Sequence, residues 1–130
     1  MAIDIAKAAQ AVGTGACFLG IEFGSTRIKA VLIDERFEVL ATGTHGWENR
    51  LENGYWTYTS DDIWDGLAGC YASLKTAVRE RYGVTLTRLG ALGMSAMMHG
   101  YLPFDTGEKQ LAAFRTWRNN FTGQASAELT

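Results

Sequence analysis

The 130-residue sequence has little of what would place it outside the cell, in a membrane or on a nucleic acid. It has two cysteines, no Cys-x-x-Cys pair and no secretory leader, so we expect a reducing, cytoplasmic location. No apolar run is long enough to cross a membrane. The net charge is only −2 and the basic residues are scattered. This pattern indicates neither a nucleic acid nor another polyanion as a partner.

What the sequence does have is enough apolar material for a packed core. Hydrophobic residues make up 47% of the chain, which argues against global disorder. The length suits one domain. Cys17 follows a glycine-rich break and begins a predicted strand, and Cys70 falls in a predicted helix. We therefore expect both to be buried thiols.

Three extended segments are predicted in the first third of the chain, at about 17–23, 27–34 and 37–44. The connections between them are only a few residues long. Connections this short favour antiparallel neighbours, because parallel strands need a long crossover. The first two segments form a tight β-hairpin around Gly24-Ser25-Thr26.

The clearest helix is predicted at about 60–82. Thr59 or Ser60 can cap its start, and Gly83 supplies its end. Apolar residues recur at helical spacing and form one stripe: Ile63, Leu67, Cys70, Tyr71, Leu74 and Val78. A strand of small apolar residues follows at 89–94, and the intervening helix lets it run parallel to an earlier strand.

The remaining segments have weaker patterns. Residues 3–12 are Ala-rich and can form a short helix, which we assign to a loosely held N-terminal extension spanning residues 1–16. Residues 45–59 are predicted to be a loop with a short extended piece near Trp56 and Tyr58.

Two further strands are predicted at 101–105 and 111–114, with Pro103 indicating an edge or a bulge. A helix is predicted to begin at Ser126. The expected order along the chain is therefore β-β-β-α-β, then β-β. This order predicts an α/β fold with three antiparallel strands, a crossover helix and a parallel strand.

The hairpin turn carries the first candidate site. Gly24 allows close approach of the backbone, while Ser25 and Thr26 can donate hydrogen bonds through hydroxyl and amide groups. The carboxylate of Glu22, just before the turn, can hold Mg²⁺ or its water. These features suit a loop that wraps a phosphate. They also suit an ordinary hairpin whose polar residues only turn the chain.

The stretch from Glu22 to Lys29 resembles a known phosphate motif, Asp-x-Gly-Thr/Ser-x-x-x-Lys/Arg. That motif belongs to the ribonuclease-H-like, or actin-like ATPase, fold of actin, hexokinases and sugar kinases. Three later segments are similar to the FGGY carbohydrate kinases: Gly54-Tyr55-Trp56 with Asp61-Asp62-Ile63-Trp64, Leu92 to Gly100, and Arg115 to Asn120. The resemblance covers residues 17–130 and is closest to the xylulokinase branch.

This resemblance implies an enzyme that transfers the γ-phosphate of ATP to a sugar hydroxyl, with Mg²⁺ as a cofactor. A ketopentose such as xylulose is the implied substrate. By the resemblance, Glu22 is the magnesium-side carboxylate, Gly24, Ser25 and Thr26 approach the phosphate, and Lys29 supplies positive charge. The family has Asp where this chain has Glu22, which moves the carboxylate by about one bond length and weakens the metal assignment.

The resemblance also implies a sugar site. Met98 and His99 would line it, Trp117 would stack on the sugar and Asn119 would bind hydroxyl groups. Without the resemblance, His99 would be interpreted as a structural histidine at the end of a strand. Met97 stands where the family has Gln, and Asn119 stands where Asp is common, so the hydroxyl pattern of the sugar is expected to differ.

No catalytic residue is assigned, because the general-base Asp of the family lies in a segment beyond residue 130. We interpret residues 17–130 as the first part of the N-terminal kinase domain, with the C-terminal domain absent. The isolated chain is then expected to be inactive and to need the missing C-terminal part as its partner. Surface that normally packs on that part would be exposed, which favours self-association as a homodimer.

Two other functions fit the same residues. Glu22, Met97 and Asn119 each depart from the family pattern, as expected of a non-catalytic module that binds a sugar or a nucleotide. The turn alone also fits an actin-like ATPase outside the sugar kinases.

Overall fold

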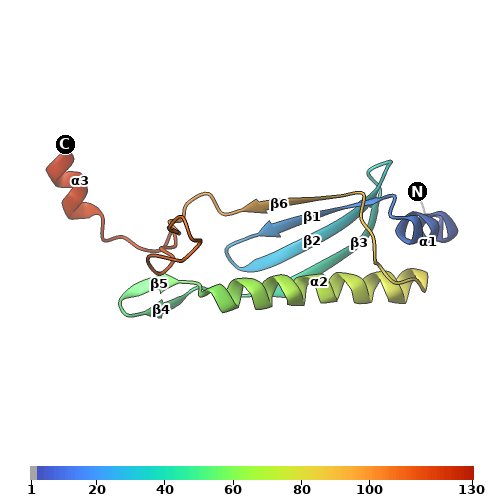
Figure 1. The fold of residues 1–130 in the computed structure, drawn as a ribbon, viewed down its shortest axis with the longest axis horizontal. Helices are drawn as coiled ribbons and strands as arrows, with labels where there is room; N and C mark the ends of the chain where they lie inside the picture. The colour runs from blue at the N-terminus through green and yellow to red at the C-terminus, as the bar shows by residue number, and fades with distance from the viewer. Residues whose placement is uncertain (1–2) are drawn as a thin grey trace.

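The computed structural model describes residues 3–130, and a four-stranded sheet in the order β3–β2–β1–β6 lies at its centre (Figure 1). The first three strands are antiparallel neighbours, and the fourth runs parallel to β1. Their bounds are β1 Cys17–Phe23, β2 Arg27–Asp34, β3 Val39–Gly46 and β6 Ala91–Ala96. The predicted antiparallel trio with one parallel strand is confirmed.

The first two strands have the predicted bounds, but the other two lie slightly later in the chain. Strand β3 begins at Val39 because residues 35–38 form the turn after β2. The Asp34 carboxylate accepts hydrogen bonds from the backbone N–H groups of Arg36 and Glu38, which fixes that turn. An aspartate that binds the backbone two residues on is a usual turn former.

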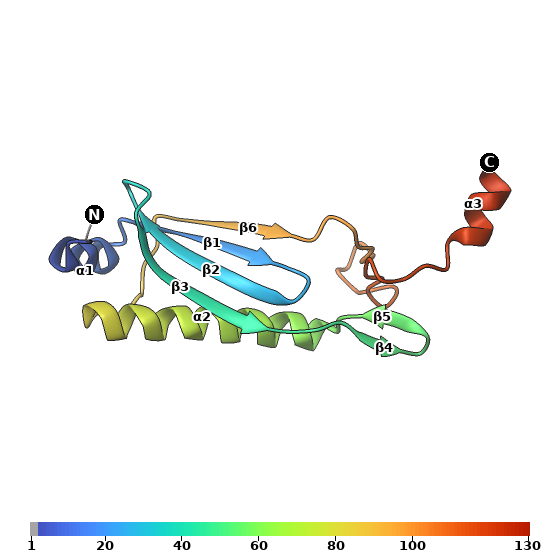
Figure 2. The same ribbon diagram turned by 180° about the vertical axis from the view of Figure 1, so that it is seen from behind.

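Helix α2 (Ser60–Tyr82) covers one face of the sheet along its whole length (Figure 2). Its start has a capping box, in which Thr59 and Asp62 each accept a hydrogen bond from the other's backbone N–H. The predicted apolar stripe is buried through Cys70, Leu74 and Val78. The two cysteines are free, buried thiols, as predicted.

The helix approaches β3 closely because Gly43 has no side chain. A Cβ atom at this position would lie 2.5 Å from the carbonyl oxygen of Cys70 and 2.6 Å from the backbone nitrogen of Leu74. Both atoms belong to the helix backbone and cannot be moved without shifting α2. Sheet and helix therefore form one layer each around a single apolar core.

Helix α1 (Ile5–Thr14) packs against the core, so the prediction of a loosely held extension is wrong. Ala8 and Val12 are buried, and their four-residue spacing puts them on the same face of the helix. The carboxylate of Asp4 caps the helix by accepting from the backbone of Ala6 and Lys7. Figure 1 shows α1 beside the C-terminal end of α2.

A short hairpin precedes α2, where the sequence predicted a loop with one extended piece. It consists of β4 (Arg50–Glu52) and β5 (Tyr55–Thr57), with Asn53 and Gly54 between them at φ 51° and 82°. Two central residues with positive φ are typical of the turns that join adjacent antiparallel strands, and Asn-Gly is their usual sequence.

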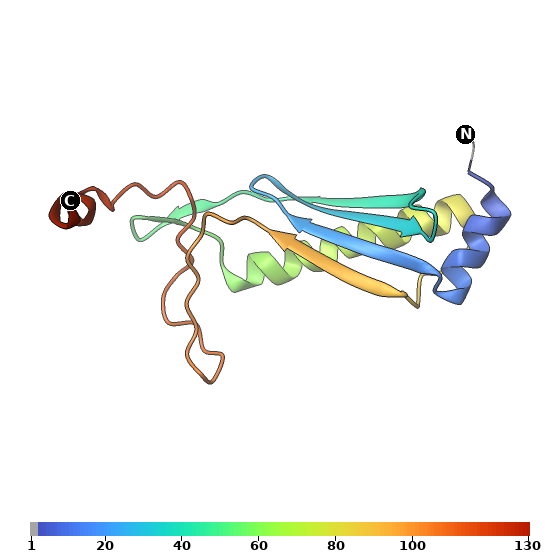
Figure 3. The same cartoon turned by 90° about the horizontal axis from the view of Figure 1, so that it is seen from above.

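The chain after β6 is much more open, and Figure 3 shows it running away from the sheet. The strands predicted at 101–105 and 111–114 are wrong: only two isolated pairs form there, Tyr101 with Arg115 and Phe104 with Gln110. Pro103 lacks an N–H group and contributes only its carbonyl, so no regular ladder develops between them. Helix α3 (Gly123–Leu129) ends the chain and begins before the predicted Ser126. Within residues 3–130, no helix is both long and apolar enough to span a membrane.

Candidate functional site

The turn between β1 and β2 forms one wall of the candidate site. Its backbone is tight, because the N–H of Gly24 donates to the carbonyl oxygen of Arg27 at 3.0 Å. A Cβ atom at Gly24 would lie 2.8 Å from that same oxygen. This position therefore needs glycine because the turn backbone comes close to itself, while the predicted approach to a phosphate stays a prediction.

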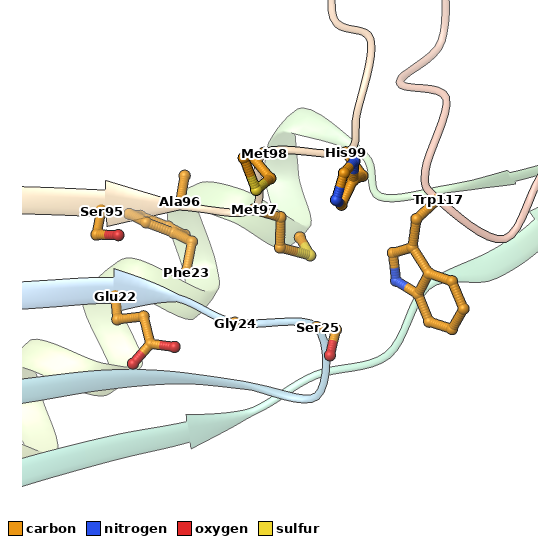
Figure 4. Close-up of a pocket in the computed structure, with 10 residues that line it drawn as sticks. All are labelled: Glu22, Phe23, Gly24, Ser25, Ser95, Ala96, Met97, Met98, His99 and Trp117. Atoms are coloured by element: carbon orange, nitrogen blue, oxygen red, sulfur yellow. The ribbon is translucent and has the colours of Figure 1, made fainter.

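The parallel pairing of β1 and β6 forms the opposite wall. Glu22 lies in register with Ser95, so both strands end at the same edge of the sheet. Residues that follow β6 are thereby carried past the β1–β2 turn. Figure 4 shows Met98 and His99 in this position, on the chain just beyond the end of β6.

Between these walls lies a pocket of about 380 Å³, which opens to solvent. Glu22 and His99 both line it, one from β1 and the other from the chain beyond β6 (Figure 4). Three residues predicted for the phosphate and the metal line the pocket together with three predicted for the sugar: Glu22, Gly24 and Ser25, and Met98, His99 and Trp117. Phe23, Ser95, Ala96 and Met97 complete the lining.

Lys29 lies beside this pocket and pairs with Glu22. The two residues face each other across β1 and β2, and the Lys29 Nζ lies 3.2 Å from the Glu22 Oε2. Both side chains are about half exposed, on the face of the sheet that α2 does not cover. The lysine charge is thus next to the pocket but is engaged by the carboxylate. Thr26 is exposed in the turn and does not line the pocket.

Asn119 lies outside the pocket, and both ends of its amide are bound to backbone. Its Oδ1 accepts from the N–H of Trp56 at 2.9 Å, and its Nδ2 donates to the carbonyls of Trp56 and Thr116 at 2.8 and 3.0 Å. These bonds tie the segment that carries Trp117 to strand β5. The predicted contact of Asn119 with a sugar hydroxyl stays a prediction.

The sequence analysis missed two aromatic residues that lie under the turn. The Trp47 Nε1 donates to the carbonyl of Gly24 at 2.7 Å, and the Tyr58 hydroxyl donates to the carbonyl of Ser25 at 2.7 Å. Their rings are stacked, with centroids 4.2 Å apart and planes 24° from parallel. A buried Trp or Tyr needs a partner for its polar hydrogen, and that requirement is the signal that could have identified them.

The pocket offers a single carboxylate to a metal. Within the described residues, no three of His, Cys, Asp and Glu come close enough to form a metal-binding group. Mg²⁺ is commonly held by one or two carboxylates together with phosphate oxygens and water. Glu22 and the Ser25 hydroxyl therefore fit a magnesium ion that arrives with a nucleotide and not one held by protein groups alone.

The sequence that forms this pocket matches the model of a known protein family. The model of the FGGY family of carbohydrate kinases, N-terminal domain, matches residues 17–130. A search of proteins with curated functions finds no match.

Solved structures give similar folds. A xyloylose kinase from Brucella ovis superposes with a TM-score of 0.71 at 21% identity over 87% of this chain. A xylulose kinase from Rhodospirillum rubrum gives 0.70 and 21% over 87%. A glycerol kinase from Plasmodium falciparum, with ADP, gives 0.68 and 16% over 88%. The chain spans 23%, 22% and 22% of these three structures respectively.

The matched residues include both walls of the pocket, and the similar structures share the actin-like ATPase fold. Proteins of this family generally use ATP and a divalent metal. The chain belongs to the FGGY family of carbohydrate kinases.

Proposed function

We propose that this chain forms the phosphate-binding wall and part of the sugar-binding wall of an ATP-dependent kinase for a ketopentose such as xylulose. One observation carries the proposal: a single pocket is lined by Glu22 and turn residues on one side and by His99 and Trp117 on the other. Phosphoryl transfer needs the γ-phosphate and the accepting hydroxyl to be held close together and in line.

On the phosphate side, the turn of Gly24, Ser25 and Thr26 approaches the γ-phosphate through amide and hydroxyl groups. Glu22 is the carboxylate on the magnesium side, and bound Mg²⁺ would neutralise charge on the phosphates. In the proposed complex, Lys29 turns from Glu22 toward the phosphate oxygens. Its position beside the pocket supports this role, since the metal would take its place as the counter-charge of the carboxylate.

On the sugar side, the His99 ring binds a hydroxyl group of the substrate, with Met98 against its carbon skeleton. Trp117 offers a flat, half-exposed ring on which the sugar face can stack. The proton of the accepting hydroxyl must leave as the new P–O bond forms. We propose that a general-base aspartate in the rest of the kinase, outside residues 1–130, accepts it.

Steady-state kinetics of the protein in which this chain is joined to the rest of its kinase tests the proposal. We expect D-xylulose to stimulate ADP release, and D-ribulose, D-gluconate and glycerol to do so less. His99→Ala should raise the KM for the sugar at least about tenfold and leave the KM for ATP unchanged, because it removes a hydrogen bond made only to the sugar.

The control is His45→Ala, which changes the only other histidine, on β3 against Gly69 and outside the pocket. It should leave the KM for the sugar unaltered. If no ketose or polyol stimulates ATP turnover, the kinase proposal is lost.

Two contacts favour a second candidate, a non-catalytic sugar-binding module. The Glu22 carboxylate is paired with Lys29, and the Asn119 amide is occupied by backbone. Calorimetry of the protein in which this chain is joined to the rest of its kinase separates the two functions. Binding of D-xylulose without any heat from Mg·ATP would favour the module, whereas heat from Mg·ATP that vanishes in Glu22→Gln would favour the kinase.

A further inference from the structure

The carbonyl groups of the β1–β2 turn are held in an unusual way. Three consecutive carbonyl groups of the turn accept hydrogen bonds from Trp47 and Tyr58. The Gly24 carbonyl accepts from the Trp47 indole N–H, and the Ser25 carbonyl accepts from the Tyr58 hydroxyl. The Thr26 carbonyl accepts from the backbone N–H of Trp47 at 3.2 Å. We call these three bonds the carbonyl clamp. Its donors come from the end of β3 and from the loop before α2, both far along the chain from the turn.

The clamp replaces the bond that normally closes such a turn. In most two-residue hairpins the N–H of the residue after the loop donates to the carbonyl of the residue before it. Here that carbonyl belongs to Gly24 and is bound by Trp47. Within residues 3–130, the Arg27 N–H makes no hydrogen bond to it.

Peptide geometry then fixes the direction of the amides. Every described peptide bond is trans, so each N–H points opposite to the carbonyl of the preceding residue. With the Gly24 and Ser25 carbonyls directed toward the aromatic rings, the amides of Ser25 and Thr26 point away from those rings. In the described part of the chain, neither amide donates to a protein acceptor. Successive free amides of this kind form an anion-binding concavity.

We propose that Trp47 and Tyr58 are positioning residues that hold the turn amides ready for the transferred phosphate. The inference rests on the proposed phosphate-binding role of the turn. It assigns the orientation of the anion site to two side chains that never touch the anion. Preorganised donors of this type need no rearrangement when charge arrives, which is the main source of electrostatic stabilisation in phosphoryl transfer.

Packing makes the clamp rigid. Tyr58 is 1% exposed, and the centroid of its ring lies 4.2 Å from that of Trp47 and 5.9 Å from that of Phe114. The ring of Phe23, the last residue of β1, has its centroid 6.0 Å from that of Trp47. The Trp47 and Tyr58 side chains therefore have little freedom to move. Their hydrogen bonds hold the carbonyl groups of the turn in place.

Tyr58→Phe is the decisive variant, because it removes one hydroxyl and keeps the ring. The chain offers a matched control in Tyr82→Phe. The Tyr82 hydroxyl also donates to a backbone carbonyl, that of Leu40 at 2.7 Å, but at the far end of α2. Both variants lose one buried bond of the same kind and should lose similar stability. Trp47→Phe, which removes the indole donor, is the second test variant.

The measurement is NMR of the ¹⁵N-labelled 130-residue chain. In the wild-type chain, inorganic phosphate should shift the amide signals of Ser25 and Thr26. We expect Tyr58→Phe and Trp47→Phe to raise the apparent Kd for phosphate about two- to tenfold, the range of one lost hydrogen bond. Tyr82→Phe should leave this Kd unchanged.

Backbone relaxation without ligand provides a second measurement. Order parameters at residues 24–26 should resemble those of the adjoining strands in the wild-type chain and in Tyr82→Phe. They should fall toward loop values in the two clamp variants. Clamp variants that match Tyr82→Phe in both Kd and order parameters would overturn the inference and leave the kinase proposal intact. If phosphate does not shift the Ser25 and Thr26 signals of the wild-type chain, the proposed function is contradicted. The order parameters alone would then test whether Trp47 and Tyr58 hold the turn.

Discussion

The sheet region, residues 3–96, and the outer segment, residues 97–130, are built very differently. Every buried residue of the apolar core belongs to the sheet region, whereas Thr116 is the one buried residue described in the outer segment. The sheet region supplies Glu22 and the turn, and the outer segment supplies Met98, His99 and Trp117. The two walls of one pocket therefore differ in how firmly they are held.

This difference indicates which part of the site is ready before a ligand binds. The turn, which is the proposed phosphate side, is fixed by β-sheet pairing and by the rings of Trp47 and Tyr58. On the proposed sugar side, Met98 is 84% exposed and Trp117 is 56% exposed. Large apolar side chains exposed at a pocket rim usually await a ligand or another protein surface. We therefore expect the sugar side to become ordered on binding and the phosphate side to change little.

The largest expected effect is a cavity in the sheet region. Leu74→Ala deletes a fully buried side chain of α2 and should lower the free energy of unfolding by about 2–5 kcal/mol. Leu111→Ala, at 63% exposure in the outer segment, should change it by less than about 0.5 kcal/mol. Urea denaturation followed by circular dichroism measures both. If the two variants lose the same unfolding free energy, the two regions do not differ in packing.

A smaller effect is expected from a methyl group added between β3 and α2. Gly43→Ala should destabilise the chain by about 1–3 kcal/mol or more, because the added Cβ meets the helix backbone. Gly93→Ala is the control within the same sheet, since a Cβ there has no neighbour within 4 Å. Thermal unfolding of both variants tests the point. A neutral Gly43→Ala would mean that α2 can move away from the sheet.

The helix cap at the border of the sheet region should contribute about 1 kcal/mol. Burial raises the pKa of Asp62, but hydrogen bonds from Thr59 and the charge of Arg50 outweigh it and lower the pKa below its ordinary value of 3.8. A lowered pKa means that the ionised carboxylate stabilises the fold above about pH 4, and that this stabilisation is lost as the pH falls further.

The variant Asp62→Asn tests this effect. Its deficit in unfolding free energy relative to the wild-type chain should be largest at neutral pH and shrink below about pH 4. A deficit that is the same at pH 3 and pH 7 would contradict the assigned role of the charge. Glu80→Gln, which removes an exposed carboxylate elsewhere on the same helix, is the control for the loss of one negative charge.

The smallest effect on stability is expected at the rim of the pocket. Trp117→Ala should change the unfolding free energy by less than about 0.5 kcal/mol, since the ring is more than half exposed.

Amide hydrogen exchange should be fast throughout the outer segment and slow in β1 and β2. Slow exchange at residues 97–115 would mean that the two regions unfold together.

Much of the sheet region could be predicted from sequence because local and tertiary preferences agree there. Thr59, the apolar stripe and Gly83 mark the ends and the buried face of α2, and the hairpin is specified by its turn. Helix α1 was predicted as an element, but its packing was not. Its Ala-rich sequence does not reveal which other surface Val12 will meet.

The outer segment was predicted less well because its short apolar runs are like those of β-strands. Tyr101 and Leu111 belong to apolar runs, yet each is more than 60% exposed and no sheet edge receives them. In the candidate site, two motifs predicted roles for Glu22 and His99, and both residues line one pocket. The hydrogen-bond partners of Trp47 and Tyr58 were not predicted, because each bond joins residues more than twenty positions apart and follows no local spacing.

The two cysteines give the sheet region a chemical reporter of its own. Burial raises the pKa of both Cys17 and Cys70, so at neutral pH they are protonated and poorly nucleophilic. An alkylating reagent such as iodoacetamide can modify them only after the core has opened. The rate of alkylation therefore measures how often the core opens, and motion of the outer segment alone does not change it. Mass spectrometry of the alkylated chain would measure this rate without any engineered label.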